Sequence, residues 1–214
     1  MTLDVMFFRF SGGEEQPTLT TREVVMRPPV FSDYEAWCQV RLESREFLQP
    51  WEPTWPPTDL LRTAFKARIR RYAKDRREGT GYTFFLFHRE TGALLGGITL
   101  SNVRRGVTQS ATLGYWMGVN SAGKGLMRQS VSRLLLFVFE DLKLHRVEAA
   151  CLPHNTASIN LLKRVGFREE GYARRYLYIN GQWQDHILFA ILKDDVEYSD
   201  TFSPQNERDG DNRR

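Results

Sequence analysis

The stretch GYWMGVNSAGKGLMRQSVSRLLLFVFEDL, residues 114–142, constrains the fold of this chain more than any other segment. Its aromatic start is typical of a strand, and apolar residues at helical spacing predict a helix over 124–142. Gly123 and Gly125 lie between these two elements. One glycine is enough for a turn, so the second indicates that something approaches the backbone there.

The same reasoning gives a coarse map of the chain. Three successive strands with short connections indicate an antiparallel meander, and the Asn180-Gly181 pair is a strong hairpin signal. The order predicts one α+β domain. In chain order the expected elements are a strand at 21–27, helices at 32–48 and 58–78, strands at 82–90, 94–105 and 110–118, the helix at 124–142, a strand at 145–152, a helix at 155–165, and strands at 168–179 and 182–192.

The domain boundaries follow from composition. We expect an N-terminal arm at 1–17, one folded domain at 18–193, and a disordered polar tail at 194–214. A formal charge of +4 and a pI near 9.2 fit an acidic ligand or proximity to nucleic acid, but require neither.

Cysteine usage and hydropathy suggest the compartment. Cys38 and Cys151 lie far apart, and neither forms a metal-type spacing with histidine, so we expect no disulfide framework and no metal. No signal-peptide pattern opens the chain and no run of eighteen apolar residues occurs. These features predict a cytoplasmic protein with no membrane association.

The glycine turn is a candidate anion site. The first N–H groups of a helix lack intrahelical partners, and the helix dipole adds positive potential there. Gly123 and Gly125 remove side chains that would keep a diphosphate away, and Lys124 adds a cation. The pattern lacks the Gly-Lys-Ser/Thr of a P-loop and the third glycine of a dinucleotide fingerprint, which disfavours nucleotide hydrolysis and nicotinamide redox chemistry. Alone, such a turn is often an ordinary loop.

A second motif, NTASINLLKRVGF, covers residues 155–167. Asn155 caps a helix, Ser158 shares its face, and Gly166 ends it. An amphipathic helix without chemistry would account for this segment by itself. The two motifs together resemble the acetyl-CoA site of the GNAT N-acetyltransferase superfamily, and the order of elements agrees over about residues 18–193.

Further short runs are similar to the RimJ-type ribosomal-protein-alanine N-acetyltransferases, a branch that acetylates the N-terminal α-amine of a ribosomal protein. These runs are FLQPWEP at 47–53, LGY at 113–115, LHRVEA at 144–149 and KRVGFREEGYARRYLYINGQWQDH at 163–186. The resemblance implies a GNAT fold: a central mixed, mostly antiparallel sheet flanked by helices, in which a splayed strand pair forms the acetyl-CoA cleft.

The resemblance also implies which residues bind acetyl-CoA. Pantetheine would lie in the gap between the splayed strands, along the edge formed by Met117, Gly118 and Val119. Asn155 would bond the pantetheine arm or order the site, and Ser158 would lie near the thioester sulfur. The diphosphate would lie on the backbone amides of Gly123, Lys124, Gly125, Leu126 and Met127.

Three departures from the family pattern affect the chemistry. Asn120 stands where the signature usually has Gln or Arg, and Leu162 stands where many members have a tyrosine that protonates the departing thiolate. The resemblance implies that Ser158 takes over that role. A glutamate that is the base in one branch would fall at Leu177, so it is missing.

The mechanism expected is direct attack of a neutral amine on the acetyl thioester, with no covalent enzyme intermediate. The candidate bases are Glu52, Asp185 and His186, or water; we favour Glu52, because its loop carries Trp51 and Trp55 and would cover the acceptor pocket. Its alternative role is that of a surface carboxylate beside packed tryptophans. The two residues on the hairpin fit better as groups that hold it together.

Partners and rival functions remain open at this point. The helix at 58–78 carries eight Lys and Arg residues, which form either a solvated face or a contact with ribosomal RNA. We expect a monomer or a weak dimer. The alternatives to the ribosomal acceptor are an acetyltransferase for a small amine, such as a polyamine or aminoglycoside, and a non-catalytic module that binds acyl-CoA or RNA during ribosome assembly.

Overall fold

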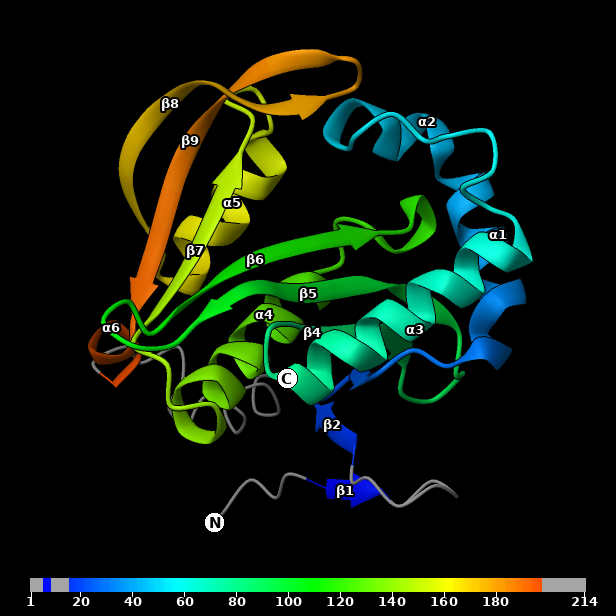
Figure 1. Ribbon diagram of the computed structural model, residues 1–214, viewed down its shortest axis with the longest axis horizontal. Helices are drawn as coiled ribbons and strands as arrows, with labels where there is room; N and C mark the ends of the chain where they lie inside the picture. The colour runs from blue at the N-terminus through cyan, green and yellow to red at the C-terminus, as the bar shows by residue number, and fades with distance from the viewer. Residues whose placement is uncertain (1–5, 9–15, 198–214) are drawn as a thin grey trace, which may run out of the picture.

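The computed structural model of the chain describes residues 6–8 and 16–197 (Figure 1). Its centre is a nine-stranded sheet in the order β1-β2-β3-β4-β5-β6-β7-β9-β8. Only β6 and β7 pair in parallel, and the other neighbours are antiparallel. The prediction of a mixed, mostly antiparallel sheet flanked by helices is therefore confirmed.

The strands are β1 Met6–Phe8, β2 Gln16–Thr20, β3 Val24–Arg27, β4 Tyr82–His88, β5 Leu94–Arg104, β6 Ser110–Met117, β7 Arg146–Cys151, β8 Arg168–Ile179 and β9 Gln182–Leu192. The α-helices are α1 Tyr34–Glu43, α2 Arg45–Leu48, α3 Arg62–Glu78, α4 Leu126–Leu136, α5 Thr156–Val165 and α6 Lys193–Glu197. Short 3-10 turns η1 Phe31–Asp33, η2 Gln49–Trp51 and η3 Val119–Ser121 and a π-helical turn η4 Phe137–Asp141 complete the described part.

Both ends of the chain carry more regular structure than the sequence suggests. In the predicted arm, Met6–Phe8 pairs with β2, which begins at Gln16 and pairs onward with β3. Residues 194–197 of the predicted tail continue α6, where Asp195 accepts a hydrogen bond from the Leu192 N–H at 3.0 Å. The expected disorder at 198–214 lies outside the described residues.

Helix α1 begins at Tyr34, behind Asp33 rather than Ser32. Asp33 accepts hydrogen bonds from Arg27 at 2.7 and 2.8 Å and from the Val30 N–H at 2.8 Å, so it ties the start of α1 to the end of β3. At the other end of the helical pair, Gly79 closes α3 with a φ of +67°, as its sequence position predicts.

The helices cover the sheet on two faces, each with its own apolar core. Helices α1 and α3 enclose a small, mostly aromatic core of Trp37, Phe65, Phe85 and Leu94, in which the Trp37 and Phe65 ring centres lie 4.8 Å apart. Helices α4 and α5 pack on the larger core against the other face. In Figure 1, α3 crosses in front of the central strands and α4 lies behind them.

Strands β6 and β7 diverge after a short paired stretch (Figure 1). Their register joins only Ser110–Thr112 with Arg146–Glu148. Beyond that point β6 stays on β5 as far as Met117, whereas β7 stays on β9 as far as Cys151. The splayed strand pair that the resemblance implies is thus present.

Within residues 6–8 and 16–197, no helix is long and apolar enough to cross a membrane. Cys38 and Cys151 are both free thiols.

Candidate active site

The edge of β6 that faces the gap carries unpaired backbone groups. The Gly118 N–H donates to the Leu95 carbonyl oxygen at 2.8 Å, which fixes the alternation of the β5–β6 ladder. Even-numbered β6 residues therefore bond β5, and the backbone groups of Leu113, Tyr115 and Met117 point into the space between β6 and β7. A further extended chain could bond there as an added strand.

This register refines the edge predicted from the sequence. Met117 faces the gap as expected, whereas the N–H of Gly118 is used by β5. The Val119 N–H donates to the Ser44 hydroxyl at 3.0 Å, which ties the end of β6 to the junction of α1 and α2. The backbone groups open to a ligand thus begin nearer the strand centre than the sequence motif suggests.

The glycine turn lies at the start of α4, beyond the end of β6. Gly123 and Gly125 have φ values of +76° and +79°, and a Cβ on either would meet no atom within 4 Å. Their conformation and the open space above them both suit glycine. The first helical bond runs from Gln129 N–H to the Gly125 carbonyl at 3.2 Å, so the N–H groups of Leu126 and Met127 precede the intrahelical ladder.

Side chains in this turn divide between core and solvent. Leu126 and Met127 are 4% and 6% exposed and pack in the core behind the sheet, so only their backbone can meet a ligand. Lys124 is exposed beside the helix start. These features fit a diphosphate, which needs free N–H groups, a nearby cation and no obstructing side chain.

Ser158, in the first turn of α5, is held by groups from three elements. Its N–H donates to the Asn155 side-chain oxygen at 3.0 Å, the helix cap that the sequence predicts. Its hydroxyl lies 2.7 Å from the hydroxyl of Tyr115 on β6, and the thiol of Cys151, at the end of β7, lies near enough to interact with it. The two diverging strands and α5 therefore meet at Ser158.

Burial keeps the two neighbours of Ser158 protonated. It raises the pKa of Tyr115 to about 12, although the hydrogen bond with Ser158 acts in the opposite sense. Burial likewise raises the pKa of Cys151 to about 11. At neutral pH the cluster thus consists of two hydroxyls and a thiol without net charge.

Glu52, the favoured base, has both carboxylate oxygens engaged in hydrogen bonds. Its carboxylate accepts two hydrogen bonds from Arg41, at 2.8 and 2.6 Å, and one from the Trp55 indole at 2.7 Å. Arg41 is 6% exposed and its guanidinium carbon lies 3.9 and 5.1 Å from the ring centres of Trp55 and Trp116. Two oxygens engaged by three donors form a poor proton acceptor, so this geometry favours a structural role.

The loop that carries Glu52 lies beside the other parts of the site. The Asn180 N–H, at the tip of the β8–β9 hairpin, donates to the Glu52 carbonyl at 2.9 Å. The Trp51 ring lies 5.4 Å from the ring of His154, just before α5. The loop therefore bridges the hairpin and the start of α5, the position expected for a cover over the acceptor.

The other two candidate bases hold the hairpin together. Asp185 accepts hydrogen bonds from the Arg175 N–H at 2.7 Å and the Tyr172 hydroxyl at 2.8 Å, where β8 bulges. These bonds hold the pKa of Asp185 below its ordinary value. His186 is 3% exposed, and its Nδ1–H donates to the Gln184 carbonyl at 3.0 Å.

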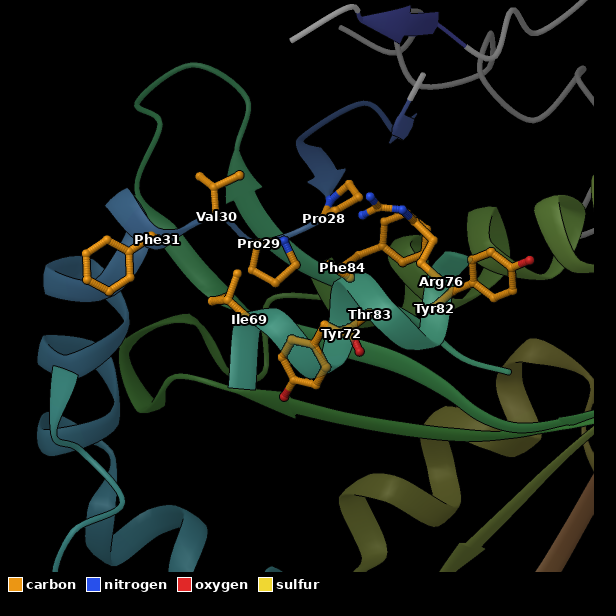
Figure 2. Close-up of a pocket in the computed structure, with 11 residues that line it drawn as sticks. Pro28, Pro29, Val30, Phe31, Ile69, Tyr72, Arg76, Tyr82, Thr83 and Phe84 are labelled. Atoms are coloured by element: carbon orange, nitrogen blue, oxygen red, sulfur yellow. The ribbon is translucent and has the colours of Figure 1, made fainter. Parts of the chain in front are cut away.

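A separate hollow of about 180 Å³ lies between α3 and the ends of β3 and β4. Figure 2 shows its lining, which includes Pro28, Pro29, Ile69, Tyr72 and Thr83. None of the residues predicted for the site belongs to it. Its mixed lining offers neither the free backbone edge nor the glycine turn of the β6–β7 gap, which is the better candidate for the site.

The structure thus brings Met117, Asn155 and Ser158 to the gap and places the glycine turn at the start of α4. Sequence reasoning missed Tyr115. The alternation of β6 places its side chain on the face of α4 and α5, but the partner of its hydroxyl lies 43 residues away. No local pattern encodes that contact.

Comparison with known proteins gives consistent results. The model of the acetyltransferase (GNAT) domain family matches residues 23–168, more than half of the chain. The ribosomal protein uS5-alanine N-acetyltransferase of Escherichia coli K12 is 34% identical over 190 residues, which cover 88% of this chain and 97% of that protein. A probable N-acetyltransferase of Bacillus subtilis, YjcK, is 32% identical over 84% of this chain and 99% of its own length.

Solved structures show the same architecture. Mycobacterium smegmatis RimJ in complex with CoA-disulfide superposes with a TM-score of 0.79 at 32% identity, over 86% of this chain and 90% of that one. The ribosomal-protein-S5-alanine acetyltransferase of Vibrio fischeri superposes with a TM-score of 0.78 at 29% identity, over 84% and 98% of the two chains.

Proposed function

Because this chain belongs to the GNAT acetyltransferase family, we propose that it transfers the acetyl group of acetyl-CoA to the N-terminal α-amine of a ribosomal protein, an alanine at that terminus. The observation that carries the acceptor is the near full-length match to an enzyme named for alanine of ribosomal protein uS5. The β6–β7 gap supports acetyl-CoA as the acetyl donor.

Acetyl-CoA fits the residues around the gap. The backbone groups of Leu113, Tyr115 and Met117 would bond pantetheine along β6, and the open turn from Gly123 to Gly125 would take the diphosphate. The relative solved with a CoA-disulfide has the same fold. Bound there, acetyl-CoA supplies an activated acyl carbon at the end of the gap near Ser158.

The residues of this chain then have two tasks. Ser158 donates a hydrogen bond to the sulfur as the thiolate departs, and Asn155 holds Ser158 in place through the cap of α5. A peptide α-amine has a pKa near 7.8, so about a tenth is already neutral at pH 7. Water therefore suffices as proton acceptor, while Glu52 positions the covering loop.

The acceptor is tested by measuring thiol release from acetyl-CoA with a peptide that begins with the N-terminal residues of the host's uS5. The matched controls are the same peptide with a blocked N-terminus, a lysine-containing peptide with a blocked N-terminus, and polyamines. We expect release, and a mass gain of one acetyl group, only with the free α-amine. Activity confined to polyamines would overturn the proposed acceptor.

We also propose that α3 contacts ribosomal RNA while the acceptor enters the site, which would place the activity in the cytoplasm. Several of its cations are exposed: Arg62, Lys66, Arg70, Arg71, Lys74 and Arg77. Some also serve the fold, since Arg62 pairs with Glu35 and Lys74 lies 3.8 Å from Glu78. Binding to ribosomal particles should weaken steeply between 50 and 200 mM salt. Binding insensitive to salt would exclude this contact.

Gel filtration would test our expectation of a monomer or weak dimer.

A further inference from the structure

The contact between Tyr115 and Ser158 joins two hydroxyls in a place where the direction of a hydrogen bond matters. The two oxygens are 2.7 Å apart, and one of them must donate. Within the described part of the chain, the Tyr115 hydroxyl hydrogen-bonds Ser158, and burial keeps the Tyr115 phenol protonated. A phenol is a stronger donor and a weaker acceptor than an aliphatic alcohol, because its lone pair is delocalised into the ring. Tyr115 is therefore the donor.

This direction restricts the proton of Ser158. A serine hydroxyl has one hydrogen and two acceptor positions, and Tyr115 fills one of the acceptor positions. The hydrogen of Ser158 must then point away from Tyr115. Cys151 lies near Ser158, and its buried thiol is a weak hydrogen-bonding group. The other direction open to the hydrogen is the gap beside β6. There the sulfur of the acetyl donor would become a strong acceptor as negative charge develops on it.

We infer that Tyr115 is a positioning residue for acetyl transfer: its hydroxyl donates to Ser158 and thereby directs the Ser158 O–H at the sulfur that leaves. The inference rests on the proposed function. In the transfer, a bond forms between the amine nitrogen and the acyl carbon while the carbon–sulfur bond breaks. The electron pair stays on sulfur and the amine proton passes to water. Ser158 stabilises the thiolate, and donation by Tyr115 strengthens its hydrogen bond through cooperativity.

A double-mutant cycle tests the coupling. Tyr115→Phe removes only the hydroxyl and should lower kcat about tenfold, with the KM for acetyl-CoA unchanged. Ser158→Ala should lower kcat at least as much. Because Tyr115 acts through Ser158, the double variant should be no slower than Ser158→Ala alone. The same tenfold loss from Tyr115→Phe in the Ser158→Ala background would overturn the inference, as would a change confined to KM.

Two controls separate this role from a merely structural one. Tyr82→Phe removes the hydroxyl of another half-buried tyrosine, which packs edge-on against Phe137 away from the gap, and should leave kcat unchanged. The selenoester analogue of acetyl-CoA has a more stable leaving anion, so the penalty of Tyr115→Phe should shrink with it. An equal penalty with both donors would contradict a role at the leaving group.

The outcomes also separate this inference from the proposed function. A wild-type protein that acetylates the uS5 peptide, together with a Tyr115→Phe variant of equal kcat, would remove the inference and leave the function. A wild-type protein that acetylates polyamines only, with the coupling of Tyr115 and Ser158 intact, would remove the proposed acceptor and leave the inference.

Discussion

The two sides of β6 use polar groups and glycines in opposite ways. On the side of α1 and α3, Trp116 packs against Phe85 and Arg41, and Arg41 is locked to Glu52. On the face of α4 and α5, beside the gap, the neutral hydroxyls of Tyr115 and Ser158 lie 2.7 Å apart. Adjacent residues of one strand thus belong to a closed side, where charges are paired and fixed, and an open side, where uncharged groups can meet a ligand.

Glycines mark the same contrast. On the closed side, a Cβ on Gly97, which is opposite Phe85 and Trp116, would lie 2.5 Å from the Trp116 indole nitrogen. On the open side, Gly123 and Gly125 have nothing within 4 Å of such an atom. Gly97 is required because the chain fills the space around it, whereas Gly123 and Gly125 leave space that the chain does not fill. A glycine by itself therefore does not identify a binding site.

The largest effect is expected on the closed side. Gly97→Ala places a methyl group against the Trp116 indole, which is packed against Phe85 and Arg41, so the free energy of unfolding should fall by about 3 kcal/mol. Chemical denaturation measures it. Protein that remains folded should bind acetyl-CoA with unchanged affinity. A loss of affinity for acetyl-CoA without a loss of stability would contradict the contrast between the closed and open sides.

Glu52→Gln should show a stability effect and little effect on the chemistry. The variant leaves the buried Arg41 charge without a counter-ion, and Glu52 is partly solvated, so we expect a loss of about 2 kcal/mol. Denaturation and the dependence of kcat on pH are measured together. If Glu52 is instead the base, kcat falls sharply and its pH profile changes while stability is retained.

Gly125→Ala should act mainly on the open side. A left-handed φ costs an alanine about 1 kcal/mol of stability, and a methyl group here also enters the proposed diphosphate space. Gly92→Ala is a matched control, because Gly92 has a φ of +69° and equally open surroundings in the β4–β5 turn. Both variants should lose similar stability, but only Gly125→Ala should raise the KM for acetyl-CoA, by about tenfold. An equal KM for acetyl-CoA in both variants would show that the turn does not bind acetyl-CoA.

The smallest effect concerns Asp185 and pH. Its pKa is lowered in the folded state, so its contribution to stability is present above its unfolded pKa and is lost as the pH falls through the folded value. The stability difference between wild type and Asp185→Asn should therefore stay constant from neutral pH down to about pH 5 and shrink below about pH 4. Tyr172→Phe removes one of the two hydrogen bonds and should give a smaller version of this difference. A difference that grows on acidification would contradict the assignment.

Most elements of the fold could be predicted from local patterns. The meander, the Gly79 and Gly166 helix ends and the Asn180-Gly181 hairpin all follow from periodicity and turn chemistry. The arm could not, because β2 begins with Gln16 and Pro17 and gains its strand conformation by pairing with β3. Tertiary pairing overrides weak local preference in such a segment.

The candidate site, like the fold, has parts that local sequence patterns predict and parts that they do not. The glycine turn and the Asn155 cap are local and could be predicted. The ion pair of Glu52 with Arg41 and the bond of Tyr115 with Ser158 each join elements that are distant in the sequence. Their geometry depends on how α1, α5 and β6 pack, and a carboxylate in a loop looks the same in sequence whether it is free or paired.

Three residue pairs connect β6 to β7 and so join the two halves of the sheet. A molecule bound in the gap adds contacts to both halves, so donor binding and unfolding are thermodynamically linked. At a donor concentration one hundred times the dissociation constant, the folded state gains about 2.7 kcal/mol, comparable with the larger mutational effects above. The supply of acetyl-CoA in the cell would then determine how much of this protein survives heat or proteolysis, in addition to how fast it works.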